Sequence, residues 1–323
     1  MADGSDAMSA TSPKGRSRAL EGVRVIELAQ GIAGPYCGRL FADYGADVVK
    51  VERPGTGDFT RGWGPFPGDR PDVEKSGLFF FLNTNKRSVT LDVDHARDRE
   101  RLLDLLRDAD VLIDDSSPRL LQERGLDYAT LARINPDLVM ISCTPFGQTG
   151  PYADWRGYEL NAYHLSATGS RYCGLPDREP LATGEFLADF FGGFAAAAWG
   201  LGAVLGRGQV GGGQHVDCAS AEVLAALVVG SLNVGGYAQD GVFYRRTGRG
   251  MGLACPARIY PCRDGWVFII ALETHQWLGL CRAMGSPDWA MPELFHELKS
   301  RGANRDLIDP MIEEWTLQRP KNE

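Results

Sequence analysis

Residues 20–58 read LEGVRVIELAQGIAGPYCGRLFADYGADVVKVERPGTGD, and this segment is the most informative in the chain. Its apolar run at 23–28 predicts a buried parallel strand. A turn of small residues follows at 31–35, and Pro35 suits the first turn of a helix. A second apolar run at 48–51 completes a βαβ unit, whose first turn favours an anionic or carbonyl ligand at a helix N-terminus. The turn lacks the G-x-G-x-x-G spacing of nicotinamide-binding proteins, which disfavours a dehydrogenase.

The rest of the chain continues the same alternation before its character changes. Strand and helix patterns alternate from residue 20 to about 150, followed by a long small-residue helix at 189–205 and a strand at 215–218. This pattern predicts an α/β fold with a doubly wound, Rossmann-like parallel sheet. An Asp-Gly turn at 264–265 predicts a β-hairpin within 258–271, which we interpret as the opening of a second, smaller α+β domain.

Composition limits the class of protein. The chain has 323 residues and a formal net charge of −8, which argues against a nucleic-acid-binding protein. Charges or glycines interrupt the longest apolar stretches, and residues 1–18 lack the apolar core of a secretory signal. Seven cysteines form no C-x-x-C pair and no cluster with histidine at zinc spacing. We therefore expect a cytoplasmic protein with no bound metal and no membrane association.

Several further motifs occur in a fixed order along the chain. They are NTNKRS at 83–88 leading into VTLD at 89–92, ADVLI at 109–113, NPDLV at 135–139, FGQTGP at 146–151 and the segment 208–216. Together with the first βαβ unit, they resemble family III CoA-transferases, the group that includes formyl-CoA transferase, carnitine CoA-transferase and α-methylacyl-CoA racemase. The resemblance runs from about residue 20 to the end of the chain.

The resemblance implies an acyl-CoA:carboxylate CoA-transferase that uses coenzyme A as a substrate and needs no resident cofactor. In such an enzyme an aspartate attacks the thioester, forms a mixed anhydride and then carries CoA as a thioester. The matching position is Asp189, within GEFLADFFGG at 184–193. The residues alone favour an aspartate that only caps a helix, and the ordered family motifs around it favour the nucleophile.

Tyr158 and Glu159 form the second candidate pair. Racemases of the resembled family carry His-Asp at these positions, because proton transfer at the α-carbon needs an acid/base pair. Tyrosine, with an ordinary pKa of about 10, is a poor proton acceptor near neutral pH. An acyl-CoA racemase or isomerase is therefore the alternative enzyme, and a surface carboxylate is the alternative interpretation of Glu159.

The resemblance also implies six contacts with CoA. They are Gly31, Ile32, Arg53, Leu91, Arg124 and Arg156. The two residues of the first turn would approach the pantetheine and the thioester, and Arg53 would meet the adenine and ribose-phosphate end. Leu91 would line the nucleotide pocket, and the two later arginines would lie near the diphosphate.

One motif departs from the family pattern. Where Glu-Asn-Phe-x-Pro-Gly is expected, the chain has Asp115 and Ser116 in place of the asparagine and the aromatic residue. An anion beside a polyanionic ligand and the loss of an aromatic wall are both expected to weaken CoA binding unless Arg119 compensates.

Members of the resembled family continue beyond the position that matches residue 323. We therefore expect a truncated member, a split-enzyme subunit or an expressed fragment, and a degenerate, inactive paralogue is the non-enzyme alternative. The expected assembly is an interlocked homodimer, or a heteromer with a subunit that supplies the remaining C-terminal part. The predicted organisation is a disordered tail at 1–18, a CoA-binding Rossmann-like domain at 19–234, a linker at 235–252 and an incomplete small domain at 253–323.

Overall fold

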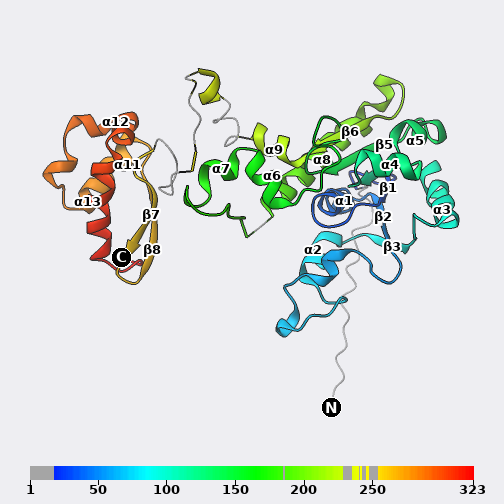
Figure 1. Cartoon of the computed structure of the whole chain (residues 1–323), viewed down its shortest axis with the longest axis horizontal. Coiled ribbons are helices and arrows are strands. Elements are labelled where there is room, and N and C mark those ends of the chain that lie inside the picture. The colour runs from blue at the N-terminus through cyan, green and yellow to red at the C-terminus, as the bar shows by residue number, and fades with distance from the viewer. Residues whose placement is uncertain (1–17, 185, 228–234, 240, 242–244, 247–253) are drawn as a thin grey trace, which may run out of the picture. The chain divides into compact units, whose positions relative to one another are not determined.

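The computed structural model describes two compact units of the chain (Figure 1). The first contains the residues up to Gly157 together with Phe186–Val223, and the second contains Tyr158–Glu185 together with Leu224–Glu323. The segment 158–185 thus groups with the second unit, whereas the sequence prediction assigned it to the first domain. The described residues are 18–184, 186–227, 235–239, 241, 245–246 and 254–323. Residues 1–17 of the predicted tail and most of the predicted linker lie outside these ranges.

The first unit is built on a six-stranded sheet whose order is β3-β2-β1-β4-β5-β6. All five strand pairs are parallel. The chain order of the strands reverses between β1 and β4, which is the switch point of a Rossmann-type sheet. The prediction of a doubly wound parallel sheet is confirmed. The strands are β1 (Arg24–Glu27), β2 (Asp47–Glu52), β3 (Arg87–Thr90), β4 (Val111–Asp114), β5 (Val139–Thr144) and β6 (His215–Ala219).

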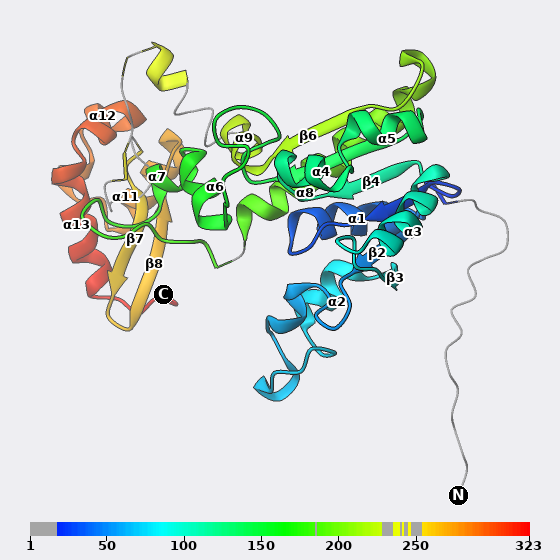
Figure 2. The same cartoon turned by 45° about the vertical axis from the view of Figure 1, so that its right-hand side comes forward.

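Helices cover both faces of this sheet, because successive strand residues point to opposite sides. Val25 and Ile113 pack on one face with α1 and α8, and Ile26 and Leu112 pack on the other with α3, α4 and α5. Figure 2 shows these helices beside the strands of the sheet. The helices of this unit are α1 (Ala33–Asp43), α2 (Gly77–Asn83), α3 (Ala96–Arg107), α4 (Pro118–Arg124), α5 (Tyr128–Ile134) and α8 (Leu187–Val210), and α9 (Ser220–Ala226) follows β6.

Helix α8 contains the small-residue segment predicted at 189–205 and packs closely through its glycines. A Cβ at Gly193 would lie 2.3 Å from the Ala33 carbonyl oxygen of α1, and one at Gly200 would lie 2.1 Å from Ile141 of β5. Within the described residues, α8 alone has the length and apolar composition to cross a membrane. Its small residues instead pack in the core beside α1 and the sheet, which accounts for that composition.

The second unit has its own core, in which Tyr260 of the hairpin β7–β8 packs near Trp277 of α11. The hairpin predicted around the Asp-Gly turn is present as antiparallel β7 and β8. Helices α6 and α7 come from the segment 158–185. The elements are α6 (Glu159–Leu165), α7 (Thr168–Tyr172), β7 (Ala257–Cys262), β8 (Gly265–Ile270), α11 (Thr274–Ala283), α12 (Leu298–Ala303) and α13 (Arg305–Leu317).

Candidate functional site

A pocket of about 100 Å³ lies at the carboxyl ends of strands β1 to β4. Ligands of open α/β sheets bind at this edge, beside the point where the strand order reverses. Loop residues that follow each strand line the pocket, including Gln30 after β1, Arg53 after β2, Leu91 after β3 and Asp115 after β4. Arg124 of α4 completes the lining. The pocket therefore brings together three of the six residues predicted to bind CoA.

Two arginines of this pocket converge on one carboxylate. Arg124 Nη2 lies 2.8 Å from Asp94 Oδ1, and Arg53 Nη2 lies 3.6 Å from Asp94 Oδ2. The side chain of Arg53 is 58% exposed. A guanidinium has five N–H donors in a planar fork, so these two groups retain the capacity to bind a phosphate. Asp92, Asp114 and Asp115 also line the pocket, so Arg53 and Arg124 supply its positive charge against four carboxylates in all.

Asp115 and Ser116, the two residues that depart from the family pattern, line the same pocket. Asp115 Oδ2 accepts a hydrogen bond of 3.0 Å from the backbone N–H of Gln30, which ties the β4 loop to the turn after β1. Asp114 Oδ1 accepts one of 2.7 Å from the N–H of Ser116. Burial, followed by the neighbouring Asp114 charge, raises the pKa of Asp115 to about 7. Asp115 thus changes charge near neutral pH, at a position where CoA would bring several negative charges.

The turn after β1 has a conformation that depends on glycine. Gly31 has a φ of 74°, and a Cβ at this position would lie 2.7 Å from the ring of Phe59. Its N–H donates a hydrogen bond of 3.3 Å to Asp58 Oδ1. Ile32 is buried at the N-cap position of α1 and has no side-chain acceptor for the first N–H groups of that helix. The turn therefore presents a helix N-terminus next to the pocket-lining Gln30.

A cluster of four buried charged side chains surrounds this turn. Lys50 Nζ lies 2.9 Å from Glu27 Oε1 and 2.8 Å from Asp58 Oδ2. Lys86 Nζ lies 2.8 Å from Glu27 Oε2. Burial opposes the charge of Lys50, but Glu27 and Asp58 outweigh it and raise the pKa of Lys50. Sequence reasoning missed this cluster, although a glutamate and a lysine inside the apolar strands β1 and β2 were a visible signal.

Asp189 lies in the first turn of α8 and is half-buried. Phe186 occupies the N-cap position in a left-handed conformation, so Asp189 is not the helix cap that the residues alone allowed. The ring of Phe190 meets that of Tyr36 in α1, with 5.0 Å between centroids. Helix α8 therefore begins beside α1, and the helix dipole there favours a negatively charged Asp189.

The other candidate residues are not part of the pocket lining. Glu159 begins α6 in the second unit, where it is buried and accepts a hydrogen bond of 3.5 Å from Thr183 Oγ1. Tyr158, at the N-cap of α6, is 73% exposed. Arg156 is exposed in the loop before α6 and does not line the pocket. The interpretation of Glu159 as a surface carboxylate is wrong.

Comparison with known proteins identifies the family. The family model of CoA-transferase family III matches residues 20–323. The chain belongs to CoA-transferase family III. It is 35% identical over 310 residues to succinate–glutarate CoA-transferase of Agrobacterium fabrum, covering 95% of this chain and 77% of that protein. It is 32% identical over 329 residues to formyl-CoA:oxalate CoA-transferase of Rhodopseudomonas palustris, covering 95% and 76%.

A solved structure agrees with this family membership. The crystal structure of a CaiB/BaiF family protein from Brucella suis matches with a TM-score of 0.77 and 33% identity, covering 95% of this chain and 80% of that one. The predicted resemblance is therefore confirmed as family membership.

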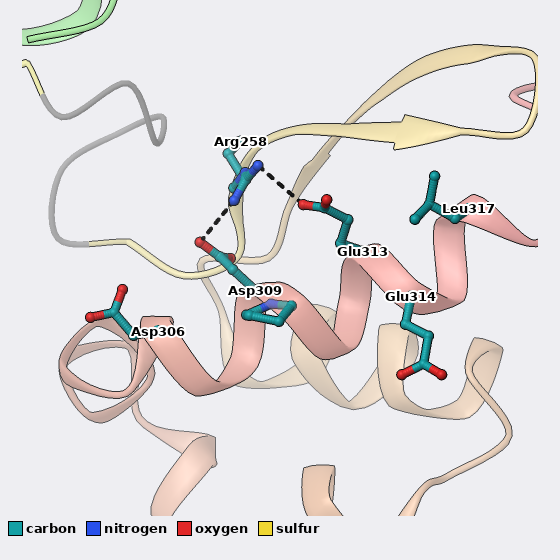
Figure 3. A pocket seen from close by; sticks show the side chains of 7 residues that line it. Arg258, Asp306, Asp309, Glu313, Glu314 and Leu317 are labelled. Carbon is teal, nitrogen blue, oxygen red and sulfur yellow. Dashed lines mark hydrogen bonds and ion pairs between the residues drawn. The ribbon is translucent and has the colours of Figure 1, made fainter. Parts of the chain in front are cut away.

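This family III CoA-transferase chain has a larger pocket, of about 470 Å³, between β7 and α13 of its second unit. Figure 3 shows Arg258 between Asp309 and Glu313, with N–O distances of 3.6 and 3.4 Å. Asp306 and Glu314 also line the pocket. Four carboxylates line this pocket with a single arginine, which is already paired with two of them. The pocket at the sheet edge has two arginines for its four carboxylates and is therefore the better candidate for CoA.

Proposed function

We propose that the protein transfers CoA from an acyl-CoA to a carboxylic acid, with Asp189 as the nucleophile. The observation that carries this proposal is the position of Asp189 in the first turn of α8, beside α1 and in the same unit as the pocket of Arg53 and Arg124. Membership of CoA-transferase family III supports the reaction class. The N-terminus of a helix favours a negatively charged carboxylate, which is the form that attacks a thioester.

The proposed reaction is a sequence of acyl transfers at Asp189. A carboxylate oxygen of Asp189 attacks the thioester carbonyl, and the C–S bond breaks to give a mixed anhydride and CoA thiolate. The thiolate then attacks the aspartyl carbonyl, which releases the donor carboxylate and leaves an aspartyl-CoA thioester. The acceptor carboxylate attacks the carbonyl of this thioester, and the C–S bond breaks to give a new anhydride and CoA thiolate. The thiolate finally attacks the acceptor acyl carbonyl, which forms the new acyl-CoA and releases the carboxylate of Asp189.

The other proposed contacts divide along the length of the CoA molecule. Arg53 and Arg124 would hold phosphate groups in the pocket, and Leu91 would contact the nucleotide. Gly31 and Ile32 would present backbone groups to the pantetheine and the thioester. Binding energy from the nucleotide end would then hold the thioester in position for attack.

We propose that both acyl groups come from small carboxylic acids, as the names of the relatives suggest. The Agrobacterium protein is named for succinate and glutarate, and the Rhodopseudomonas protein for formyl-CoA and oxalate. We further propose that the protein works in the cytoplasm, as a homodimer or a heteromer. Tyr158 stands where racemases of the family carry histidine, and a tyrosine disfavours racemisation because it is a poor proton acceptor near neutral pH.

The test is transfer of CoA from succinyl-CoA to glutarate or oxalate, measured in buffer prepared with deuterium oxide. Wild type and Asp189→Ala are compared, with Asp104→Ala as a matched control because that aspartate is 72% exposed on α3. We expect transfer by wild type and the control, none by Asp189→Ala, and no deuterium at the α-carbon. Deuterium incorporation without transfer would instead indicate a racemase, and neither signal would indicate a degenerate paralogue.

A further inference from the structure

We propose that Lys50 and Lys86, together with Glu27 and Asp58, are positioning residues that hold the turn at residues 29–35 for the reaction. This inference rests on the proposed function, because that turn is where the thioester would lie. The four side chains form one cluster beneath the turn. None of them is among the residues that the sequence predicted to bind CoA or to react with it.

Three members of the cluster contact the backbone of the turn directly. Lys50 Nζ donates a hydrogen bond of 2.9 Å to the Ala29 carbonyl at the start of the turn. Asp58 accepts the N–H of Gly31 in its middle. Lys86 Nζ donates one of 2.7 Å to the Pro35 carbonyl at its end. The cluster thus fixes the beginning, middle and end of the segment that leads into α1.

The fourth member holds the two lysines together. Glu27 binds Lys50 through Oε1 and Lys86 through Oε2, so one carboxylate connects the contacts at the two ends of the turn. A Cβ at Gly38 would lie 1.8 Å from Glu27 Oε2, which shows that the backbone of α1 passes directly over this carboxylate. Any shift of Glu27 would therefore be passed to α1 as well as to the turn.

The burial of these charges argues for a geometric role. The side chains of Glu27 and Asp58 are 0% exposed and those of both lysines 2% exposed. Ion pairs buried this deeply cost as much in desolvation as they return, so apolar side chains would serve stability equally well. Charged groups, unlike apolar ones, impose directional contacts of fixed length on the backbone. A displacement of a reacting group by about 1 Å costs roughly 100-fold in rate, so a loss of positioning should be measurable as a lower kcat.

The titration of Lys86 gives the cluster a pH dependence. Burial lowers the pKa of Lys86 to about 8, against the opposing charge of Glu27. The groups that face its ammonium are Glu27 of β1, Lys50 of β2, Cys37 of α1 and the amide oxygen of Asn83 in α2. Loss of the proton leaves two carboxylates with one charged lysine. The Lys86 amine then has two N–H groups for three acceptors, which are the Glu27 carboxylate, the Pro35 carbonyl and the Asn83 amide oxygen. The value of kcat should therefore fall as the pH rises above about 8.

The first experiment compares Lys86→Met with Lys75→Met in the full chain. Lys75 is a matched control because it pairs with Asp72 on the surface and is 61% exposed. We expect Lys86→Met to lower kcat by at least about tenfold and to remove the fall in kcat above pH 8. The Kd for CoA should change by less than about threefold, because Lys86 does not line the pocket of Arg53 and Arg124. The control should match wild type. Equal loss of kcat and CoA affinity would overturn the proposal.

The double variant Glu27→Gln/Lys86→Met separates positioning from stability. It keeps the cluster neutral, with Lys50 facing Asp58, but leaves the Pro35 carbonyl without the Lys86 donor. We expect the Tm of the double variant to lie above that of Lys86→Met and close to that of wild type, while its kcat stays as low as that of Lys86→Met. Recovery of kcat together with Tm would show that the cluster only stabilises the fold, and would overturn the proposal.

Hydrogen exchange supplies a readout that needs no turnover. In Lys86→Met, amides of the turn at 29–36 should exchange at least about tenfold faster than in wild type, because their local opening becomes easier. Amides of the hairpin Ala257–Ile270 in the second unit should be unchanged. Unchanged exchange in the turn would refute the positioning role. A wild-type chain without transferase activity would refute the proposed function instead, and this measurement would still decide the role of the cluster.

Discussion

Replacing Asp115 by asparagine should change how CoA binding depends on pH. The carboxyl group lines the pocket at the carboxyl edge of the sheet, and burial raises its pKa to about 7. As the pH rises through 7 the group ionises and repels the phosphates of CoA. As the pH falls below 7 it becomes neutral, as the amide of Asp115→Asn is at every pH. The wild-type affinity should therefore be highest on the acid side.

The size of the effect follows from the pKa. With a pKa of about 7, the neutral fraction of Asp115 falls from about 0.9 at pH 6 to about 0.1 at pH 8. If only the neutral form binds CoA tightly, the Kd rises about tenfold over this range, which is about 1.4 kcal/mol. The phosphate groups of CoA also titrate near pH 6. That contribution is common to wild type and variant, so it cancels in the comparison.

Isothermal titration of CoA at pH 6, 7 and 8 measures the effect. We expect Asp115→Asn to equal wild type at pH 6 and to bind about tenfold more tightly than wild type at pH 8. Asp104→Asn, which neutralises an exposed carboxylate, serves as the control and should follow wild type. The same pH slope in wild type and Asp115→Asn would refute the reasoning, because Asp115 would then not face the ligand.

Two further substitutions test the pocket and the second unit. Arg53→Ala should raise the KM for every acyl-CoA by a similar factor with little change in kcat, since Arg53 would bind the nucleotide that all acyl-CoAs share. Steady-state kinetics with two acyl-CoA donors measures this. A factor that depends on the acyl group would show that Arg53 does not bind the nucleotide. Arg301→Met should destabilise the second unit by about 3 kcal/mol or more, because the buried guanidinium donates to the carbonyls of Cys255, Ala271 and Leu272. Thermal unfolding measures this loss, and an unchanged Tm would contradict it.

The sequence was sufficient for the central strands of the sheet because these strands are buried on both faces. Parallel strands of this kind are short apolar runs, and those at 23–28 and 48–51 correspond to β1 and β2. The small residues of α8 also predicted close packing, and the structure leaves no room for a methyl group at Gly193 and Gly200. These features depend on local sequence, which is why they could be predicted.

The features that the sequence did not predict depend on contacts between segments far apart in the chain. Lys50 and Lys86 meet Glu27 only because β1, β2 and the segment before β3 are brought together in the fold, and no spacing in the sequence encodes that meeting. Helix α8 begins at Leu187, before Asp189, with the left-handed Phe186 as its N-cap. A capping pattern alone therefore predicted the wrong first residue for this helix. The exposure of Arg156 also depends on the path of its loop, which the sequence does not specify.

The central claim is that Asp189 becomes covalently attached to CoA during the reaction. Mass spectrometry of the peptide that contains Asp189, after incubation with acyl-CoA and quenching with hydroxylamine, tests it most directly. We predict a hydroxamate at Asp189 that forms only when acyl-CoA is present and is absent in Asp189→Ala. An unmodified Asp189 in an enzyme that turns over normally, or normal turnover by Asp189→Ala, would contradict the account.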